Sequence, residues 1–476
     1  MIQNFKVTIV VACVFAGFVT SVIGAQASSF VFAGDAEIRK ILDERIGVHG
    51  NDIGIIVGIL EPQGRRIISS GHRSANDARP PDGDTVFEIG SLTKVFTALL
   101  LADMVETGQV ALADPVAKYL PTDIKVPERN GRSITLVDLA THTSGLPFMP
   151  ENAPAGAQYA AADLKQYVAS YQLNRDIGAK WEYSNIGYWV MSEALSARGG
   201  MDYQNLLRKR VIAPLKLTNT DFVLPPGIKA NLALGHDASV QPAPVISTLP
   251  IYSVMPAAGG LYSTVNDLLM LLSCAMDYEP SPLAPAVDMT LNTRRATGGG
   301  SKQALGWTVF GEDDDQIIFR DGGTVGYATA MAWDPKNRAG VVVLFNQIGD
   351  VADIARHLLR PDFPLTKQMT RKHNEIALDS RLLDSYIGRY EAKGEGIFTI
   401  ARDGDFLTIE SPADWGLPKL RIRPESQMDF FAAELPVRVV FTMDSNSRVT
   451  GLLIYPPRGQ NAVPANKLPS NIIDAP

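Results

Sequence analysis

Predicted β-strands lie at both ends of the first 360 residues, and a long, mostly helical region separates them. The N-terminal pair, at 53–60 and 65–70, flanks a turn and is typical of a hairpin. Apolar stretches at 317–320, 328–333 and 340–345 predict three more strands near the other end. Strands so far apart in the chain bury their apolar faces most simply in one shared sheet. We therefore predict an α+β fold, with one antiparallel sheet flanked by helices and a separate helical lobe.

Helical periodicity marks the segments around and between these strands. The region 121–285 should be mostly helical and broken by Pro/Gly loops, with a short helix at 135–141 and a longer one at 185–197. Besides a helix that begins near Ser91, the predicted helices lie at 35–45, 135–141, 185–197, 203–210 and 351–359. These helices would cover the sheet and build the lobe.

The composition changes after Pro361. Residues 361–378 are rich in Pro and charge, which favours a linker. Beyond them the pattern is strand and turn only, with hairpins predicted at 398–409 and 437–455. We therefore predict a main domain at 33–360 and a small β-barrel-like domain at 379–470.

The N-terminus has the pattern of a secretory signal peptide. Lys6 is the only early charge, residues 7–24 carry none, and Ala25-Gln26-Ala27 offers a small-residue cleavage site. An uncleaved anchor is the alternative, because the apolar run approaches the length of a membrane span. We favour cleavage after Ala27, which makes 1–27 a signal peptide and the mature protein periplasmic or secreted, without a later membrane span.

Charge and cysteine content exclude several classes of function. The 476 residues carry a formal net charge of −7 and no basic run, so nucleic acid is not an expected partner. Cys13 lies in the predicted signal, which leaves Cys274 alone and no internal disulfide. Cys274 sits in an apolar helical run and is predicted to be a buried core thiol. No zinc-binding pattern occurs, so we expect no metal and no cofactor.

Ser91 and Lys94 are the first candidate catalytic residues. They open an amphipathic helical segment that Gly108 ends, and three positions apart they share one face of a helix. The positive end of the helix dipole favours a developing alkoxide on the serine. A desolvated lysine loses proton affinity and can act as a base toward it. By itself this pattern is common, so it needs partners elsewhere in the chain.

Tyr183 and Asn185 form the second candidate group, at a junction between a loop and a helix. A phenol close to a lysine ammonium can shuttle a proton, and the Asn185 amide can hold the lysine or a substrate amide. Helix capping is the structural alternative. The similar pair at Tyr203 and Asn205 falls within a charged helix, where a solvated surface explains it better.

Arg320, Gly322 and Gly323 form the third candidate group. An edge strand that ends in glycines lets the backbone approach a bound acyl group, and a basic residue before it can attract a carboxylate. Alone, the segment would be interpreted as a glycine-rich turn. His142, at a predicted helix end, is interpreted as a structural hydrogen-bonding residue rather than a catalytic base.

In this order the three groups resemble the serine β-lactamase and penicillin-binding-protein superfamily, and in particular its class C β-lactamase-like branch, which includes D-alanyl-D-alanine carboxypeptidases. The resemblance extends over about 35–346 and includes the segments 87–94, 114–121, 134–147, 181–187 and 259–267. It implies a β-lactamase-like domain at 33–360, and the tail resembles small β domains that many exported members carry.

The resemblance also implies a role for each candidate. Ser91 would be acylated, Lys94 and Tyr183 would share acid and base work, and Asn185 would orient the substrate amide. Backbone N–H groups of Ser91 and Gly323 would hold the oxyanion. Which of Lys94 and Tyr183 takes the first proton stays open at this point.

One departure from the family pattern concerns the substrate. The family usually has Lys or His where Arg320 stands, and a hydroxyl residue where Asp321 stands. Arginine can bind a carboxylate but cannot exchange a proton, and Asp321 can neutralise it. We therefore expect an exported serine hydrolase that acts on D-alanyl peptides of peptidoglycan type or β-lactams, with Arg320, Gly322 and Gly323 binding substrate. The alternatives are an esterase of the same fold acting on uncharged esters, and a non-catalytic binding module. The oligomeric state is open.

Overall fold

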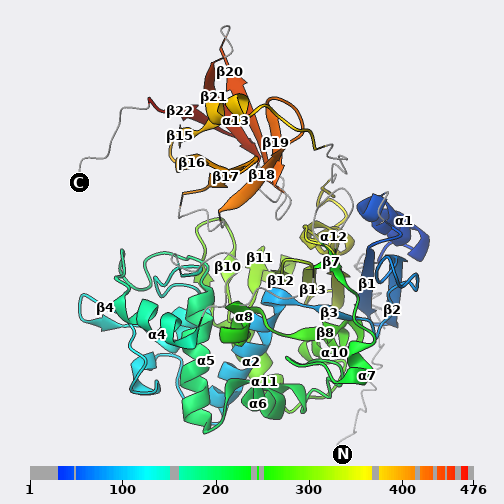
Figure 1. The fold of residues 1–476 in the computed structure, drawn as a ribbon. Helices are drawn as coiled ribbons and strands as arrows, with labels where there is room; N and C mark the ends of the chain where they lie inside the picture. The colour runs from blue at the N-terminus through cyan, green and yellow to red at the C-terminus, as the bar shows by residue number, and fades with distance from the viewer. Residues whose placement is uncertain are drawn as a thin grey trace, which may run out of the picture. The chain divides into compact units, whose positions relative to one another are not determined.

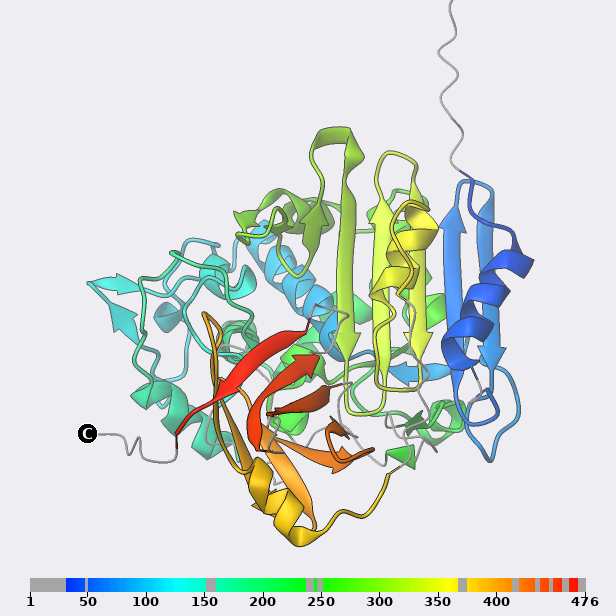
Figure 2. The ribbon, with the colours of Figure 1, turned by 90° about the horizontal axis from the view of Figure 1, so that it is seen from above.

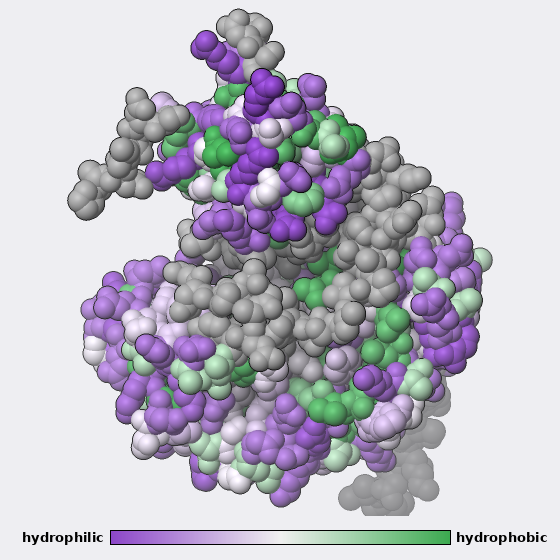
Figure 3. Space-filling view, in the orientation of Figure 1, coloured by the Kyte–Doolittle hydropathy of each residue, from purple (hydrophilic) through white to green (hydrophobic). Residues whose placement is uncertain are grey.

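The computed structural model describes residues 31–47, 50–150, 160–236, 244–245, 251–366, 375–412, 419–432, 437–444, 448–455 and 462–469. The predicted signal peptide at 1–27 and part of the predicted linker lie outside the described residues. Among the residues that are described, no helix is long and apolar enough to cross a membrane. The face seen in Figure 3 is mainly hydrophilic, with small and separate hydrophobic patches.

Eight antiparallel strands form the main sheet, in the order β2-β1-β14-β13-β12-β11-β10-β9 (Figure 1). β1 (Gly54–Glu61) pairs with β2 (Gly64–Gly71) on one side and with β14 (Ala339–Phe345) on the other. The other strands are β9 (Arg295–Ala296), β10 (Lys302–Gln303), β11 (Thr308–Phe310), β12 (Ile317–Gly323) and β13 (Ala328–Asp334). Strands from distant parts of the chain therefore share one sheet, which confirms the predicted α+β fold.

β12 differs from the strand that the sequence predicted at 317–320. Its pairing with β13 continues through the glycines, so that Gly323 lies opposite Ala328. β11 pairs with it only over 317–319. The expectation of an edge strand was therefore wrong, because β12 lies between β11 and β13. Its glycine-rich end nevertheless runs beyond the short β11.

One face of the sheet carries the main hydrophobic core. Ile56 and Leu60 of β1 belong to this core together with residues of α10 (Val265–Ala275). Gly58, between them on the same face, lies so close to α10 that a β-carbon would approach Val265 Cγ1 to 2.3 Å. The period of two along β1 therefore sets which side of the sheet α10 covers.

The other face is covered by α1 (Asp35–Ile46) and α12 (Ala352–Leu359) (Figure 2). Arg45 of α1 makes a bidentate ion pair with Asp353 of α12, with N–O distances of 3.0 and 2.5 Å. Both side chains are buried. The two ends of the domain are therefore joined by one buried salt bridge as well as by the β1–β14 pairing.

The remaining helices differ in length, and both the short helix predicted at 135–141 and the longer one predicted at 185–197 are present. They are α2 (Thr93–Glu106), α3 (Leu136–Ala140), α4 (Ala161–Ser170), α5 (Asn185–Gly199), α6 (Tyr203–Leu207), α7 (Pro226–Lys229), α8 (Ile251–Val254), α9 (Pro256–Gly259) and α11 (Ala284–Asn292). α2 packs against α5, α9 and α11 and is buried on nearly every side, more completely than the amphipathic pattern predicted. Cys274 is a buried free thiol within α10, as predicted.

The C-terminal segment forms a closed antiparallel barrel, which confirms the predicted small all-β domain. Its strands are β15 (Gly388–Ala392), β16 (Gly396–Asp403), β17 (Phe406–Glu410), β18 (Leu420–Pro424), β19 (Asp429–Ala432), β20 (Arg438–Met443), β21 (Val449–Tyr455) and β22 (Val463–Lys467). The barrel has a core of its own, to which α13 (Ser380–Tyr386) contributes Tyr386. The rings of Tyr386, Phe430 and Phe441 pack together inside it, so aromatic side chains occupy this part of the interior. The boundaries of the two domains stay a prediction.

Candidate active site

Ser91 lies in a short 3-10 helix, η2 (Gly90–Leu92), which connects β3 (Val86–Glu88) to α2. Gly90 has a φ of +49°, and a β-carbon on it would approach the carbonyl oxygen of Gly323 to 2.6 Å. Glycine meets both conditions without strain. The turn therefore brings Ser91 close to the end of β12 and places its hydroxyl at the start of α2, where the helix dipole favours negative charge.

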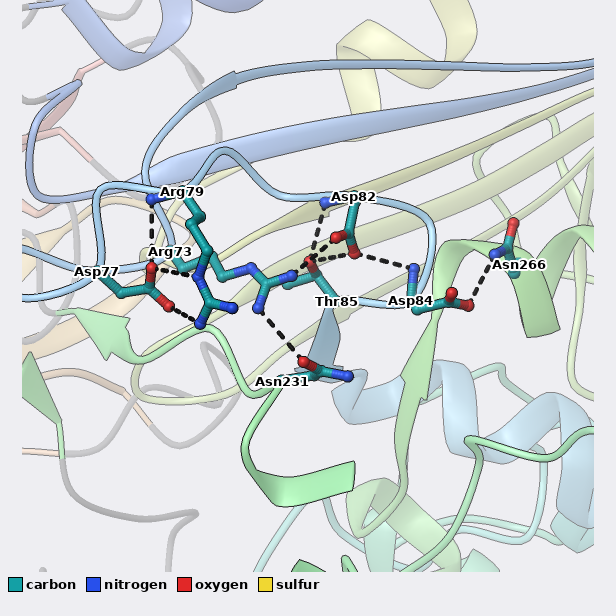
Figure 4. Close-up of polar contacts among 8 residues, drawn as sticks. All are labelled: Arg73, Asp77, Arg79, Asp82, Asp84, Thr85, Asn231 and Asn266. Atoms are coloured by element: carbon teal, nitrogen blue, oxygen red, sulfur yellow. Dashed lines mark hydrogen bonds and ion pairs between the residues drawn. The ribbon is translucent and has the colours of Figure 1, made fainter. Parts of the chain in front are cut away.

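Hydrogen bonds and an ion pair among polar side chains cross-link the loop that leads from β2 to β3 (Figure 4). The buried Arg73 donates from Nη2 to Asp82 Oδ2 at 2.9 Å, and the Thr85 hydroxyl donates to Asp82 Oδ1 at 2.8 Å. Asn266 Nδ2 donates to Asp84 Oδ1 at 2.8 Å and so ties this loop to α10. The network fixes the start of the strand that carries the chain into Ser91.

Lys94 is completely buried on the first turn of α2. Its Nζ lies 3.2 Å from Ser91 Oγ and donates to Asn185 Oδ1 at 2.7 Å and to the Ala258 carbonyl oxygen at 2.6 Å. Burial, and after it the charge of Arg320, holds the pKa of Lys94 well below its usual 10.5, although the Asp321 carboxylate acts in the opposite direction.

Tyr183 also contacts Ser91, and its ring centre lies 4.8 Å from Lys94 Nζ. Its hydroxyl donates to Ser91 Oγ at 2.7 Å. Ser184 is the N-cap of α5 and accepts from the Gly187 N–H, so the capping interpretation of this motif applies to Ser184. Asn185 is the first residue of α5, and its side chain contacts Lys94. The motif therefore caps a helix and faces the Ser91 hydroxyl at once.

Arg320 lies on β12 with its side chain buried against Tyr183. Its Nη2 donates to the Tyr183 hydroxyl oxygen at 2.7 Å, and its Nε donates to the Ser91 carbonyl oxygen at 3.3 Å. Its guanidinium carbon also lies 5.1 Å from the centre of the Tyr183 ring. The cation therefore faces the phenol oxygen, where it stabilises negative charge.

The two glycines of β12 bring its backbone close to η2. A β-carbon on Gly322 would approach the Ile89 carbonyl oxygen to 2.4 Å and Thr329 Oγ1 to 2.6 Å. Gly323 lies opposite Gly90, whose own β-carbon would meet its backbone. Glycines at 90 and 322 are therefore needed for Ser91 and the end of β12 to lie side by side, whereas a β-carbon on Gly323 would meet only the Tyr327 carbonyl oxygen, at 3.7 Å.

All seven residues singled out from the sequence, Ser91, Lys94, Tyr183, Asn185, Arg320, Gly322 and Gly323, are thus brought to one place by three separate elements. A hydroxyl with a lysine amine and a phenol within hydrogen-bonding distance is suited to acyl transfer. Within the described residues, no group of three or more His, Cys, Asp or Glu side chains could hold a metal ion.

Sequence reasoning missed two contributors to this site. Ala258 supplies only a carbonyl oxygen to Lys94, and a backbone group leaves no trace in residue type. The sulfur of Met149 lies 3.3 Å from Asn185 Nδ2. Methionine is apolar, and residue type alone does not assign an apolar residue to a site. Met149 lies two residues beyond the family-like segment 134–147 and Ala258 one residue before the segment 259–267, so only their closeness to these segments could have pointed to them.

The fold and this constellation define a serine hydrolase, and comparison with known proteins gives its family. The beta-lactamase family model matches residues 46–360, so the chain belongs to the beta-lactamase family. The D-alanyl-D-alanine-carboxypeptidase/endopeptidase AmpH of Escherichia coli K12 is 29% identical over 314 residues, which are 61% of this chain and 78% of AmpH. A beta-lactamase of the same organism is 24% identical over 360 residues, 67% of this chain and 92% of the relative.

Two further similarities agree with this assignment. Penicillin-binding protein 4* of Bacillus subtilis is 22% identical over 428 residues, 83% of this chain and 92% of the relative. The solved structure of a class C beta-lactamase matches with a TM-score of 0.60 at 20% identity, over 70% of this chain and 98% of that one. At that identity the solved structure shows the fold alone.

Proposed function

We propose that this hydrolase is an exported enzyme that forms an acyl-enzyme at Ser91 and acts on D-alanyl peptides of peptidoglycan type or on β-lactams. One observation carries the proposal: Ser91 Oγ has both the Tyr183 hydroxyl, at 2.7 Å, and Lys94 Nζ, at 3.2 Å, within hydrogen-bonding distance. The names of the relatives, a carboxypeptidase/endopeptidase and beta-lactamases, supply the substrate classes.

The contacts of Lys94 favour it as the first base. A neutral amine has two N–H groups and one lone pair. Two carbonyl oxygens, those of Asn185 and Ala258, accept from Nζ at 2.7 and 2.6 Å. The lone pair is then left for the Ser91 hydroxyl, and the lowered pKa of Lys94 favours this neutral form.

The proposed reaction uses these groups in turn. Ser91 Oγ attacks the substrate carbonyl while its proton passes to Lys94, and backbone N–H groups of Ser91 and Gly323 hold the tetrahedral oxyanion. The bond to the leaving group breaks, and the leaving atom takes up the proton by way of Tyr183. Water then attacks the acyl-enzyme with the same two groups in reversed roles.

A second candidate function is hydrolysis of uncharged esters by the same mechanism. The burial of Arg320 and its hydrogen bond to the Tyr183 hydroxyl favour it, because a guanidinium bound to the catalytic phenol is less able to bind a substrate carboxylate. A non-catalytic binding module is disfavoured, because the contacts among Ser91, Lys94 and Tyr183 are those of an activated nucleophile.

Intact-mass spectrometry with a penicillin and with a p-nitrophenyl ester tests the proposal. We expect a stoichiometric adduct with at least one of them, absent in Ser91→Ala and formed far more slowly in Lys94→Ala and Tyr183→Phe. An adduct with the ester but not with the penicillin would favour the second candidate. Normal turnover by Ser91→Ala would overturn the assignment.

Export is the second part of the proposal. It rests on the signal-like N-terminus and on the Ala-x-Ala pattern that ends at Ala27. N-terminal sequencing of the protein recovered from the periplasm or medium should begin at Ser28. Recovery of the intact N-terminus in the membrane fraction would instead support an uncleaved anchor.

A further inference from the structure

We propose that His142 is a positioning residue that holds the Tyr183 hydroxyl against Ser91. The proposal rests on the proposed function only in that Tyr183 takes part in acylation. His142 follows α3, about 40 residues before Tyr183 in the chain, and its backbone N–H caps that helix by donating to the Leu139 carbonyl oxygen. Its other groups face the segment around Tyr183.

Two hydrogen bonds from this one residue bracket Tyr183. The carbonyl oxygen of His142 accepts from the Glu182 N–H at 2.8 Å. Its ring Nδ1 accepts from the Ser184 N–H at 3.1 Å. The residues before and after Tyr183 are therefore attached to the same histidine, which leaves the backbone at Tyr183 little freedom to turn.

The ring of His142 also packs against the ring that it positions. Its centre lies 4.5 Å from that of Tyr183, and 5.2 Å from that of Tyr188 on the adjacent helix α5. On Tyr183 a further contact comes from Phe148, at 5.9 Å between ring centres. A tyrosine has only two side-chain torsions, so a fixed backbone and a packed ring together determine where its hydroxyl lies.

The state of His142 is unusual for a residue that only stabilises the fold. It is fully buried with a φ of +58°, a region that favours glycine, and its Nε2 has no hydrogen-bond partner within the described part of the chain. Because Nδ1 accepts from a backbone N–H, the neutral ring carries its proton on Nε2. Burial, followed by the charges of Arg320 and Lys94, lowers the pKa of His142 and keeps it neutral. Strain and an unmet donor of this kind are typical of functional sites.

The surrounding loop does not depend on His142 alone. The Asn185 N–H donates to the Phe148 carbonyl oxygen at 3.1 Å, and the Ser184 hydroxyl donates to the Pro147 carbonyl oxygen at 2.8 Å. These bonds hold the start of α5 whatever stands at position 142. Loss of the histidine ring should therefore displace Tyr183 without detaching the helix.

The test is the pre-steady-state burst of p-nitrophenol from p-nitrophenyl acetate with the purified protein, which separates the acylation rate constant from the apparent dissociation constant. We expect His142→Ala to slow acylation by roughly tenfold to a hundredfold, the effect of a misplaced catalytic group, with the dissociation constant changed by less than about twofold. His142→Asn keeps a side-chain acceptor and tolerates positive φ but lacks the ring that packs on Tyr183, so its rate should lie between those of His142→Ala and the parent. Thr143→Val, a buried neighbour whose hydroxyl contacts the α3 segment, is the matched control and should leave the rate unchanged.

A double-mutant cycle separates positioning from general loosening. In a Tyr183→Phe background, His142→Ala should cost less than about threefold, because the hydroxyl that it positions is already gone. An equal loss in both backgrounds, or a parent-like rate in His142→Ala, would overturn the proposal. Acylation that survives in Ser91→Ala would instead overturn the proposed function, so the two failures are distinguishable.

Discussion

Replacement of Arg320 by methionine removes the guanidinium while keeping most of the side-chain volume. The structure gives this cation one short contact, from Nη2 to the Tyr183 hydroxyl at 2.7 Å, and one longer contact to the Ser91 carbonyl at 3.3 Å. A hydrogen bond to a charged group contributes about 1.5–3 kcal/mol. At about 1.4 kcal/mol per factor of ten, kcat/KM should fall roughly tenfold to a hundredfold.

The substrate dependence of this loss tells two roles apart. If Arg320 acts through Tyr183, kcat/KM for a neutral p-nitrophenyl ester falls as much as for a penicillin. If it also binds a substrate carboxylate, as the sequence alone predicted, the penicillin loses about 1.5–3 kcal/mol more of transition-state stabilisation. A neutral ester that is turned over at the parent rate by Arg320→Met would refute the role through Tyr183.

The same variant should change the pH dependence. The positive charge of Arg320 is one of the causes that lower the pKa of Lys94. Its removal therefore raises that pKa, and the rising limb of kcat/KM against pH moves to higher pH. Arg320→Lys keeps a positive charge and is the matched control, with a smaller shift expected. A limb that moves to lower pH, or not at all, would contradict this electrostatic coupling.

Asp353→Ala should lower the free energy of unfolding by about 3–5 kcal/mol, because the buried Arg45 guanidinium loses its carboxylate partner. Urea titration measures this free energy. A loss below about 1 kcal/mol would show that water readily solvates the arginine in the variant. Gly90→Ala should abolish acylation in a protein that still folds, since the new β-carbon would approach the Gly323 carbonyl oxygen to 2.6 Å at positive φ. Gly108→Ala is its control, also at positive φ but with open space around the new β-carbon. A chain that ends before residue 379 should still be acylated at Ser91, because the barrel has its own core. If circular dichroism shows that such a chain is folded and it is nevertheless not acylated, the barrel contributes a group that acylation requires.

The fold was largely predictable because period-two and helical patterns reflect burial directly. The strands predicted at 53–60 and 340–345 lie in one sheet, as expected, and the barrel hairpins follow their turns. The glycine-rich end of β12 was not predictable as strand. Strands are recognised in a sequence by the alternation of apolar and polar side chains, and Gly322 and Gly323 have no side chains. Their pairing with β13 depends on backbone hydrogen bonds alone.

The candidate site was predictable where chemistry depends on residue type and spacing. Ser91 and Lys94 lie on adjacent turns, and the structure brings Tyr183 and Asn185 to them. The sequence could not show that the Arg320 side chain is buried against Tyr183, because that contact depends on how two distant elements pack. Nor could it show the two bonds from His142 to the Tyr183 segment, one of which involves only backbone atoms.

The pairing of β1 with β14 has a consequence for how the chain folds during synthesis. About 280 residues separate the two strands. At a synthesis rate of roughly 5–20 residues per second, β14 is made about 15–55 s after β1. During that time an apolar strand has an open edge, and such edges pair readily with other chains. Long-range pairing of this kind also slows folding. For a protein that is exported as proposed, the sheet can close only after nearly the whole first domain has been delivered.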